Sequence, residues 1–333
     1  MTELRFDGRV AIVTGAGRGL GKEYALLLAA RGARLVVTSR AASVSGEGSD
    51  VSSAEMVARE IRDAGGEAVA VTSDVATPEG GESIVRTALD AYGRVDIVVN
   101  NAGVSLDDPF ADMTLDTFQA MIDVHLKGAF HVIRPAWTTM REQGYGRVIN
   151  TSSSAGVWGV ALKAHYGAAK TGLLGLTRVL ALEGAKYNIK VNVITPTGAT
   201  RMLAQSLAKA QQEAEALEAR QEEASAGSVS AAQLKELGEM IMSRFDPALV
   251  APVVAFLAHE DCPVSGEIYT IGGGQVSRVF IGMTKGYYNP MLSPEDVRDH
   301  FAEIRDETGY TVPAHSGDEM AMFLGAPADW SAT

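Results

Sequence analysis

The feature that most constrains the fold is a glycine-rich turn between a short apolar run and a helix. Residues 9–14 have the length and apolar character of a buried strand, and residues 22–31 have a helical pattern that ends at Gly32. Small residues in such a turn let the backbone approach a pyrophosphate, and a helix N-terminus favours negative charge. The context predicts a dinucleotide site, with a tight turn that binds nothing as the alternative. The cofactor contacts expected here are Gly15, Arg18, Gly19, Leu20 and Gly21.

The rest of the chain repeats this alternation of strand and helix. Further strands are predicted at residues 34–39, 68–72, 95–99, 146–151, 189–195 and 266–271. Helices are predicted between them at residues 54–64, 79–92, 114–141, 165–187 and 247–259. Such alternation predicts an α/β fold with a doubly wound parallel sheet, which binds its ligands at the carboxyl ends of the strands.

The end of the second strand indicates which dinucleotide the chain prefers. A carboxylate there would bind the ribose hydroxyls of NAD, whereas a nearby Arg accommodates the 2′-phosphate of NADP. This chain has Ser39 and Arg40 at that point and Arg18 in the glycine turn, which favours NADP(H) and leaves NAD(H) possible. The alternative is that both arginines are solvated surface residues. Asp74 and Val75 follow the third strand, where an adenine could be held.

Two amides follow the fourth strand. Asn100 and Asn101 can tie adjacent strand ends together, and Gly103, after Ala102, would leave room for the cofactor. An ordinary turn is again the alternative, because Asn and Gly are frequent turn residues.

Residues 153–170 carry the candidate catalytic groups. Tyr166 and Lys170 are four residues apart and so lie on one face of a helix. An ammonium beside a phenol lowers the pKa of the Tyr from about 10 towards neutrality, so that its hydroxyl could exchange a proton near pH 7. Ser153, at the end of the preceding strand, could hydrogen-bond the substrate oxygen. Taken alone, the pair also fits surface residues of an ordinary amphipathic helix.

Composition narrows the classes of function. The net charge of −12 argues against a general nucleic-acid or anionic-membrane binder, and no apolar run is long enough to span a bilayer. The single cysteine, Cys262, excludes an internal disulfide and is interpreted as structural, and no metal site is predicted. Residues 1–7 lack a signal-peptide pattern and the chain does not end in a peroxisomal tripeptide, so the cytoplasm is the expected location.

Three segments differ from the alternating core. Residues 41–53 are expected to form a mobile loop, and residues 276–333 a C-terminal extension with a helix at residues 294–306. Residues 203–245 are rich in Ala, Glu and Gln and predict helices, which are either solvated surface helices, an oligomer contact or a substrate lid. A lid would wall the substrate site with apolar side chains, among them Met202, Leu203, Leu207, Leu234, Leu237, Ile241 and Met242.

Together these residues resemble the short-chain dehydrogenase/reductase family. The likeness covers about residues 7–275 and rests on Thr14-Gly15-x-x-x-Gly19-x-Gly21, residues 100–103, Ser153, Tyr166-x-x-x-Lys170 and Pro196-x-Gly198. It implies a Rossmann-type sheet of seven strands, NAD(P)-linked oxidation or reduction of an alcohol/carbonyl pair, and a homodimer or homotetramer. The acid/base, the phenol activator that also contacts ribose, and the orienting donor would be Tyr166, Lys170 and Ser153. The cofactor contacts it implies include Asp74 at the adenine, Thr200 at the nicotinamide amide, Pro196 and Gly198.

One position departs from the common pattern of the family. The usual fourth catalytic residue is an Asn, where this chain has His125. The branch with His there resembles the (3R)-hydroxyacyl-CoA dehydrogenase part of the peroxisomal multifunctional enzyme type 2. That branch carries Asp at the position of Ser39 and a much shorter segment at residues 203–245. The His125 ring could relay a proton directly, or it could be packed in the core while its backbone carbonyl alone holds the relay water.

The sequence therefore predicts an oxidoreductase that moves a hydride between a nicotinamide and a secondary alcohol carbon while Tyr166 moves the proton. The expected substrate is a 3-hydroxyacyl or 3-ketoacyl thioester or an apolar ketone, and a hydroxysteroid or other bulky cyclic alcohol is the alternative. An alternative of another class is a non-catalytic redox sensor that binds a dinucleotide. The intact set of Ser153, Tyr166 and Lys170 argues against the sensor.

Overall fold

The computed structural model describes residues 3–40, 51–219 and 230–324. The chain divides into two compact units, Met1–Arg278 and Val279–Thr333, three residues later than the boundary expected after residue 275. Most of the expected loop at residues 41–53 lies outside the described residues, and the part from Val51 onwards already belongs to a helix.

The first unit is built on one sheet of eight strands in the order β3-β2-β1-β4-β5-β6-β7-β8. The seven predicted strands are all present and pair in parallel. The eighth strand was not predicted. It follows β7 after only two residues, a connection short enough to form a hairpin, and it extends the edge of the sheet. The strands are β1 (Val10–Thr14), β2 (Arg34–Thr38), β3 (Ala68–Val71), β4 (Ile97–Asn100), β5 (Gly146–Thr151), β6 (Ile189–Thr197), β7 (Ile268–Gly272) and β8 (Gln275–Val279).

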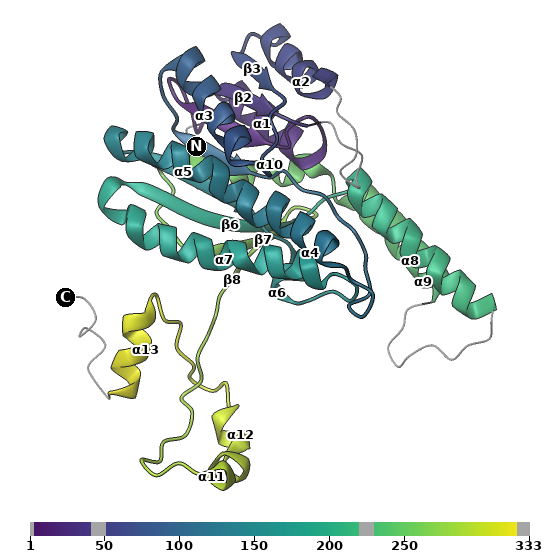
Figure 1. Ribbon diagram of the computed structural model, residues 1–333, viewed down its shortest axis with the longest axis vertical. Helices are drawn as coiled ribbons and strands as arrows, with labels where there is room; N and C mark the ends of the chain where they lie inside the picture. Colours follow the sequence, from purple (N-terminus) through teal and green to yellow (C-terminus); the bar gives the residue numbers. More distant parts are fainter. Residues whose placement is uncertain (1–2, 41–50, 220–229, 325–333) are drawn as a thin grey trace. The chain divides into compact units, whose positions relative to one another are not determined.

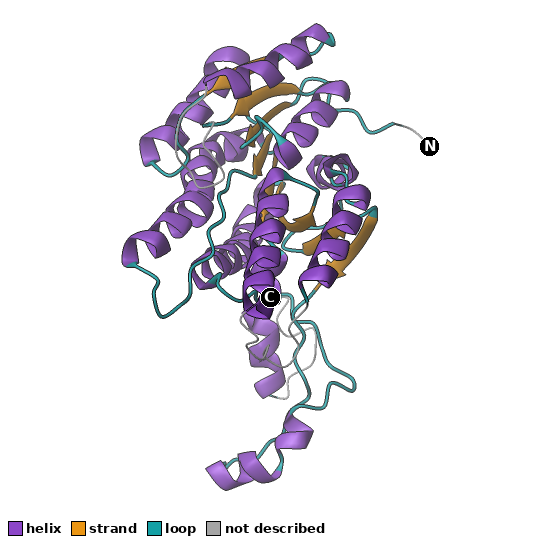
Figure 2. Ribbon diagram, turned by 90° about the vertical axis from the view of Figure 1, so that its right-hand side faces the viewer, coloured by secondary structure: helices purple, strands orange, loops and turns teal. Residues whose placement is uncertain are grey.

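Helices cover both faces of this sheet (Figures 1 and 2). One face packs against α1 (Gly19–Ala30), α2 (Val51–Asp63) and α10 (Ala251–Ala258). The other packs against α3 (Pro78–Tyr92), α5 (Gly128–Gln143) and α7 (Ala164–Gly184). This is the doubly wound arrangement that the alternating sequence predicts.

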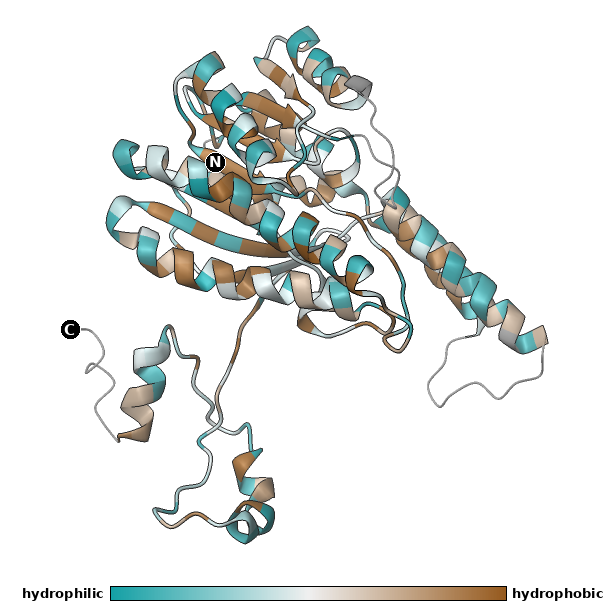
Figure 3. Cartoon of the chain, in the orientation of Figure 1, coloured by the Kyte–Doolittle hydropathy of each residue, from teal (hydrophilic) through white to brown (hydrophobic). Residues whose placement is uncertain are grey.

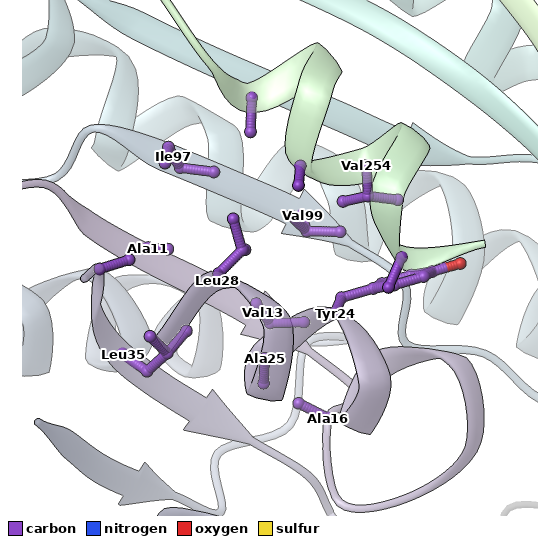
Figure 4. Close-up of a cluster of buried hydrophobic side chains, with 14 of the residues drawn as sticks. Ala11, Val13, Ala16, Tyr24, Ala25, Leu28, Leu35, Ile97, Val99 and Val254 are labelled. Atoms are coloured by element: carbon purple, nitrogen blue, oxygen red, sulfur yellow. The ribbon is translucent and has the colours of Figure 1, made fainter. Parts of the chain in front are cut away.

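Alternate residues of each strand supply the two cores. In β1, Val13 packs into the first core and Ile12 into the second. Figure 4 shows Val13 and Val99 of the sheet beside Leu28 of α1 and Val254 of α10. Figure 3 shows that the strands are largely apolar, whereas the helices carry both apolar and hydrophilic residues. Each fully buried aliphatic side chain of this kind stabilises the fold by about 1.5–3 kcal/mol.

The long helix predicted at residues 114–141 is interrupted. It consists of α4 (Leu115–Met121), a π-helix (Ile122–Lys127) and α5, with His125 in the π-helix. A π-helix accommodates an extra residue in its turn, and such segments are frequent at functional sites. The other short helices of this unit are α6 (Ser154–Val157) and the 3₁₀ segments Ala185–Tyr187 and Pro247–Leu249.

The segment that was predicted as a helical lid contains α8 (Arg201–Ala219) and α9 (Ala231–Arg244). The two helices pack along each other and leave the sheet after β6 (Figure 1). A capping box of Ser230 and Gln233 begins α9. Residues 220–229, between the helices, lie outside the described residues.

The second unit contains α11 (Pro294–Asp299), α12 (Phe301–Ile304) and α13 (Ser316–Phe323). Ser293 caps α11 as predicted, but the expected helix at residues 294–306 is divided in two, and α13 was not predicted. Within the described parts of the chain, no single helix is long and apolar enough to cross a membrane; the α9 helix passes that test only together with the next helical segment, across a bend of 61°.

Candidate active site

The glycine turn is fixed to the end of β4 by hydrogen bonds. The Thr14 hydroxyl accepts from the backbone N–H of Asn101 at 2.9 Å, and the Asn101 side chain donates to the Thr14 carbonyl at 2.9 Å. A Cβ atom at Gly21 would lie 2.5 Å from both Asn101 Nδ2 and the Gly15 carbonyl oxygen, so only glycine fits there. Asn100 in turn donates to the Asn150 side chain at 2.9 Å. The two amides therefore tie strand ends together, as the sequence predicted.

A cavity of about 570 Å³ lies at the carboxyl ends of the strands. The N-terminus of α1 opens onto it, and Arg18 at its N-cap makes no side-chain capping bond within the described chain. Backbone N–H groups there can receive an anion, so this site fits a dinucleotide. All the cofactor contacts and catalytic residues expected from the sequence line the cavity: Gly15, Arg18, Gly19, Leu20, Gly21, Ser39, Arg40, Asp74, Val75, Asn101, Ala102, Gly103, His125, Ser153, Tyr166, Lys170, Pro196, Gly198 and Thr200.

The three candidate catalytic side chains meet between β5 and α7. Ser153 follows β5, and its hydroxyl lies near enough to the phenol of Tyr166 to lower the pKa of that phenol. Burial has the larger effect and raises the pKa of Tyr166 above its ordinary value. Lys170 donates to the Thr151 carbonyl at 2.6 Å, and burial lowers its pKa to about 7. The expectation of a lowered Tyr166 pKa is therefore wrong in this structure, because burial dominates and the ammonium points to a carbonyl.

His125 lies beside Tyr166 in the core. The two rings meet edge to face with their centroids 5.0 Å apart. The Nε2 atom of His125 is 2.8 Å from the Val104 carbonyl oxygen, so it carries the proton and leaves Nδ1 as an acceptor. Burial, and then the charge of Lys170, hold the pKa of His125 well below its ordinary value, and the ring is neutral.

A second, very small cavity of about 10 Å³ lies beside this ring, with Lys170 in its wall. Its wall holds three buried polar atoms that have no hydrogen-bond partner among the described residues: His125 Nδ1, Thr151 Oγ1 and Asn100 Oδ1. A polar space of this size matches one water molecule.

Comparison with known proteins assigns this site to a family. The family model described as short chain dehydrogenase matches residues 9–212. The chain belongs to the short-chain dehydrogenase/reductase family. It is therefore an oxidoreductase that uses a nicotinamide dinucleotide to interconvert a secondary alcohol and a ketone.

Individual relatives agree with this family. A Mycobacterium tuberculosis protein assigned as a short-chain type dehydrogenase/reductase is 41% identical over 305 residues, which are 91% of this chain and 96% of that protein. A 3-oxoacyl-[acyl-carrier-protein] reductase of Synechocystis is 40% identical over 188 residues, 56% of this chain and 73% of that protein. The solved structure of full-length peroxisomal multifunctional enzyme type 2 from Drosophila melanogaster has a TM-score of 0.74 and 33% identity. That match covers 97% of this chain but 50% of the Drosophila chain.

Two cofactor-side residues of this short-chain dehydrogenase/reductase site also make contacts that the sequence did not predict. Gly103 lines the cavity, and a Cβ atom there would lie 2.5 Å from His125 Cε1, so the ring also requires the glycine. Asp74 lines the cavity as well, and its carboxylate forms an ion pair with Arg40. Ser39 is buried, and its hydroxyl lies 3.4 Å from that of Ser53 in the first turn of α2.

The substrate end of the cavity includes residues that the sequence did not single out. Ser105 and Lys163 line it together with apolar residues, which are Val104, Ala155 and Val160. Neither Ser105 nor Lys163 belongs to a motif, and only the fold brings their loops together. Of the apolar residues expected in a lid wall, Met202 and Leu203 at the start of α8 line the cavity. The other five are not among its described lining, and four of them lie on α9, which packs along α8.

Proposed function

We propose that the protein interconverts 3-hydroxyacyl and 3-ketoacyl thioesters or similar apolar ketones, as an NAD(P)-dependent alcohol dehydrogenase. The observation that carries this proposal is the meeting of Ser153, Tyr166 and Lys170 beside a cavity end with apolar walls. The likeness to the Synechocystis 3-oxoacyl-[acyl-carrier-protein] reductase supports an acyl thioester as the substrate.

The chain's own residues have separate tasks in this reaction. Ser153 would hold the carbonyl oxygen, and Tyr166, whose buried phenol keeps its proton at neutral pH, would donate that proton to it during reduction. Lys170 would bind ribose hydroxyls and restore the proton of the phenol. A bound nicotinamide would supply the hydride. The apolar residues that line the cavity beside Tyr166, Val104, Ala155 and Val160, would limit the access of water to the reacting carbonyl.

Other residues would hold the cofactor. The N-terminus of α1 would receive the pyrophosphate, and Val75 would contact the adenine. The nicotinamide amide would meet Pro196, Gly198 and Thr200, which follow one another around the end of β6.

A substrate panel tests the proposed function. The purified protein is assayed with NADPH and NADH against acetoacetyl-CoA, a longer 3-oxoacyl-CoA, a steroid ketone and a small ketone. The 3-oxoacyl thioesters should give the highest kcat/KM. A preference for the steroid would instead support the bulky cyclic substrate, and no turnover of any carbonyl would contradict the proposal.

We propose a preference for NADP(H). Ser39 replaces the carboxylate that would repel a 2′-phosphate, Ser53 places a second hydroxyl beside it, and Arg40 and Arg18 line the same end of the cavity. Arg40 forms an ion pair with the Asp74 carboxylate in this structure. If the 2′-phosphate of NADP replaced that carboxylate as its partner, the guanidinium would still be paired with an anion.

Arg40→Gln should therefore raise the KM for NADPH by about tenfold or more, the usual effect of losing a charge-assisted hydrogen bond. The KM for NADH should change little, because NADH has no phosphate at that position. Both cofactors are measured on the same variant, so that NADH serves as the control. A preference for NADH in the unmodified enzyme, or an equal loss with both cofactors, would contradict this assignment.

We propose that the His125 ring itself relays protons, because the residue lines the small polar cavity beside Lys170 and its Nδ1 has no hydrogen-bond partner among the described residues. His125→Leu, which removes the acceptor and keeps an apolar side chain, should lower kcat by about tenfold or more. His125→Asn should retain a larger share of the activity, since its amide can still accept a hydrogen bond. If both variants keep the full kcat, the backbone carbonyl alone acts and the ring is a packing residue.

The oligomer expected from the family is also proposed. Large apolar side chains lie exposed on α5 and α7, with 47% of Phe130, 53% of Val179 and 57% of Leu182 accessible. Such residues are typical of protein interfaces when they cluster. Light scattering on the purified protein distinguishes a dimer or tetramer from a monomer.

A further inference from the structure

Three segments that are distant in sequence meet at the substrate end of the cavity. They are the loop after β4, the turn before α7, and the N-terminal half of α8. The Asp108 N–H donates to the Leu162 carbonyl at 2.9 Å, and Lys163 Nζ donates to the Ser105 hydroxyl at 2.8 Å. Leu162 has a positive φ of 64°, which is uncommon for a side chain of its size and shows that the turn is held by its contacts.

Asp107 is the residue on which these segments converge. Its Oδ1 lies 2.5 Å from Lys163 Nζ, and its Oδ2 lies 3.6 Å from Lys209 Nζ of α8. The Asp107 and Lys163 side chains are 18% and 13% exposed, whereas Lys209 is half-exposed. The first ion pair is thus shielded from solvent, and the second is open to it.

The charge on Lys163 matters because of where it lies. Lys163 lines the cavity, and its Nζ is 5.7 Å from the ring centroid of Tyr166. An unpaired ammonium there would attract anionic substrates to the reacting end. Burial raises the pKa of Asp107, but hydrogen bonds and charges from Lys163 and Lys209 outweigh it and hold that pKa below its ordinary value. The carboxylate is therefore charged at neutral pH and cancels the ammonium.

We infer that Asp107 is a specificity-determining residue: it cancels the charge of Lys163 beside Tyr166 and, through Lys209, holds the N-terminal half of α8 against the substrate end of the cavity. The inference rests on the proposed function. It narrows the substrate to a carbonyl compound that carries no charge near the reacting group. It also assigns α8 a role in the site, because the first turns of that helix carry Met202, Leu203 and Ser206, which line the cavity.

The first experiment compares two ketones of similar size, one charged and one neutral: 4-oxopentanoate and its methyl ester. Asp107→Asn removes the negative charge while keeping the shape. The ratio of kcat/KM for the ester over that for the acid should fall by about tenfold or more, the effect expected of an uncompensated charge–charge contact. The change should lie in KM, with kcat for the ester nearly kept, because Ser153, Tyr166 and Lys170 are untouched. An unchanged ratio would overturn the inference.

The second experiment follows the link to α8 without using activity. Hydrogen exchange is measured over residues 201–219 in the full chain. Lys209→Gln and Asp107→Asn should both speed exchange in the first turns of α8, and Lys209→Arg should restore protection. The matched control is Lys235→Gln, an exposed lysine on α9 that should leave exchange unchanged.

Lys209→Gln should also raise the KM for the ester, by about two- to fivefold, as expected for a half-exposed ion pair. If both variants exchange like the unmodified chain, Asp107 does not hold α8 and the inference fails. If no ketone is turned over by the unmodified enzyme while the exchange results appear as expected, the proposed function fails and the contact stands.

Discussion

Replacing Tyr166 with Phe is expected to lower kcat by roughly 10²–10⁴-fold, the range for removal of a general acid or base. In the proposed reaction the phenol donates the proton to the reacting carbonyl, and the substitution removes only its hydroxyl group. The ring would still pack edge to face against His125, whose centroid is 5.0 Å away. Cofactor affinity should therefore stay close to that of the unmodified enzyme, as measured by fluorescence titration with NADPH.

Tyr92→Phe is the matched control for this change. Tyr92 is half-buried on α3, away from the cavity, and its hydroxyl makes only a 3.5 Å bond to the Leu35 carbonyl. The control should keep full activity. Turnover close to normal in Tyr166→Phe would remove the central assignment and would favour a dinucleotide-binding sensor over an enzyme.

Lys170→Met is expected to abolish most activity and, at the same time, to stabilise the fold. Folding buries the ammonium and lowers its pKa from 10.5 to about 7. Between those two pKa values Lys170 is protonated in the unfolded chain and neutral in the folded chain, so its contribution makes the free energy of unfolding rise with pH. The destabilisation caused by burying this side chain is therefore fully present below about pH 7. Methionine keeps the length without the charge and removes that cost. We expect the Tm at pH 7 to rise by roughly 2 °C or more and kcat to fall by about 10²-fold.

Thermal melts at pH 7 and at about pH 9.5 check the stability part, since the gain in Tm should shrink at the higher pH. Lys235→Met, at an exposed position on α9, is the control and should leave the Tm and its pH dependence unchanged. A lower Tm for Lys170→Met at pH 7 would show that its 2.6 Å bond to the Thr151 carbonyl is worth more than the burial costs. A Lys170→Met variant with normal turnover would exclude a role in the reaction.

Much of this architecture could be predicted from the sequence because its signals are local. A buried parallel strand is a short apolar run, and β5 was predicted at its exact residues. The cofactor and catalytic residues lie at strand ends or one helical turn apart, so sequence spacing alone brings Tyr166 and Lys170 together. The same holds for the amides of residues 100–101, which sit where neighbouring strand ends must meet.

The remaining features depend on tertiary packing, which leaves no local signal. The pKa of Tyr166 is raised because surrounding segments bury the phenol, a fact that the Tyr-x-x-x-Lys spacing does not contain. Asp107 lies 56 residues from Lys163 and 102 from Lys209, and none of the three belongs to a motif. The eighth strand is largely exposed and lacks the apolar run that marked the other seven.

The π-helix at Ile122–Lys127 makes the length of this segment as important as its composition. Deleting one residue there would allow an ordinary α-helix to run from α4 into α5. Because α5 is anchored in the core by Val132 and Met140, the adjustment would fall on the preceding turns, which would rotate by about 100°. His125 would then leave the face that meets Tyr166. Single-residue deletions should accordingly be tolerated far less in this π-helix than in the solvent-facing parts of α8. Relatives with a histidine at the position of His125 should also conserve the number of residues between β4 and β5.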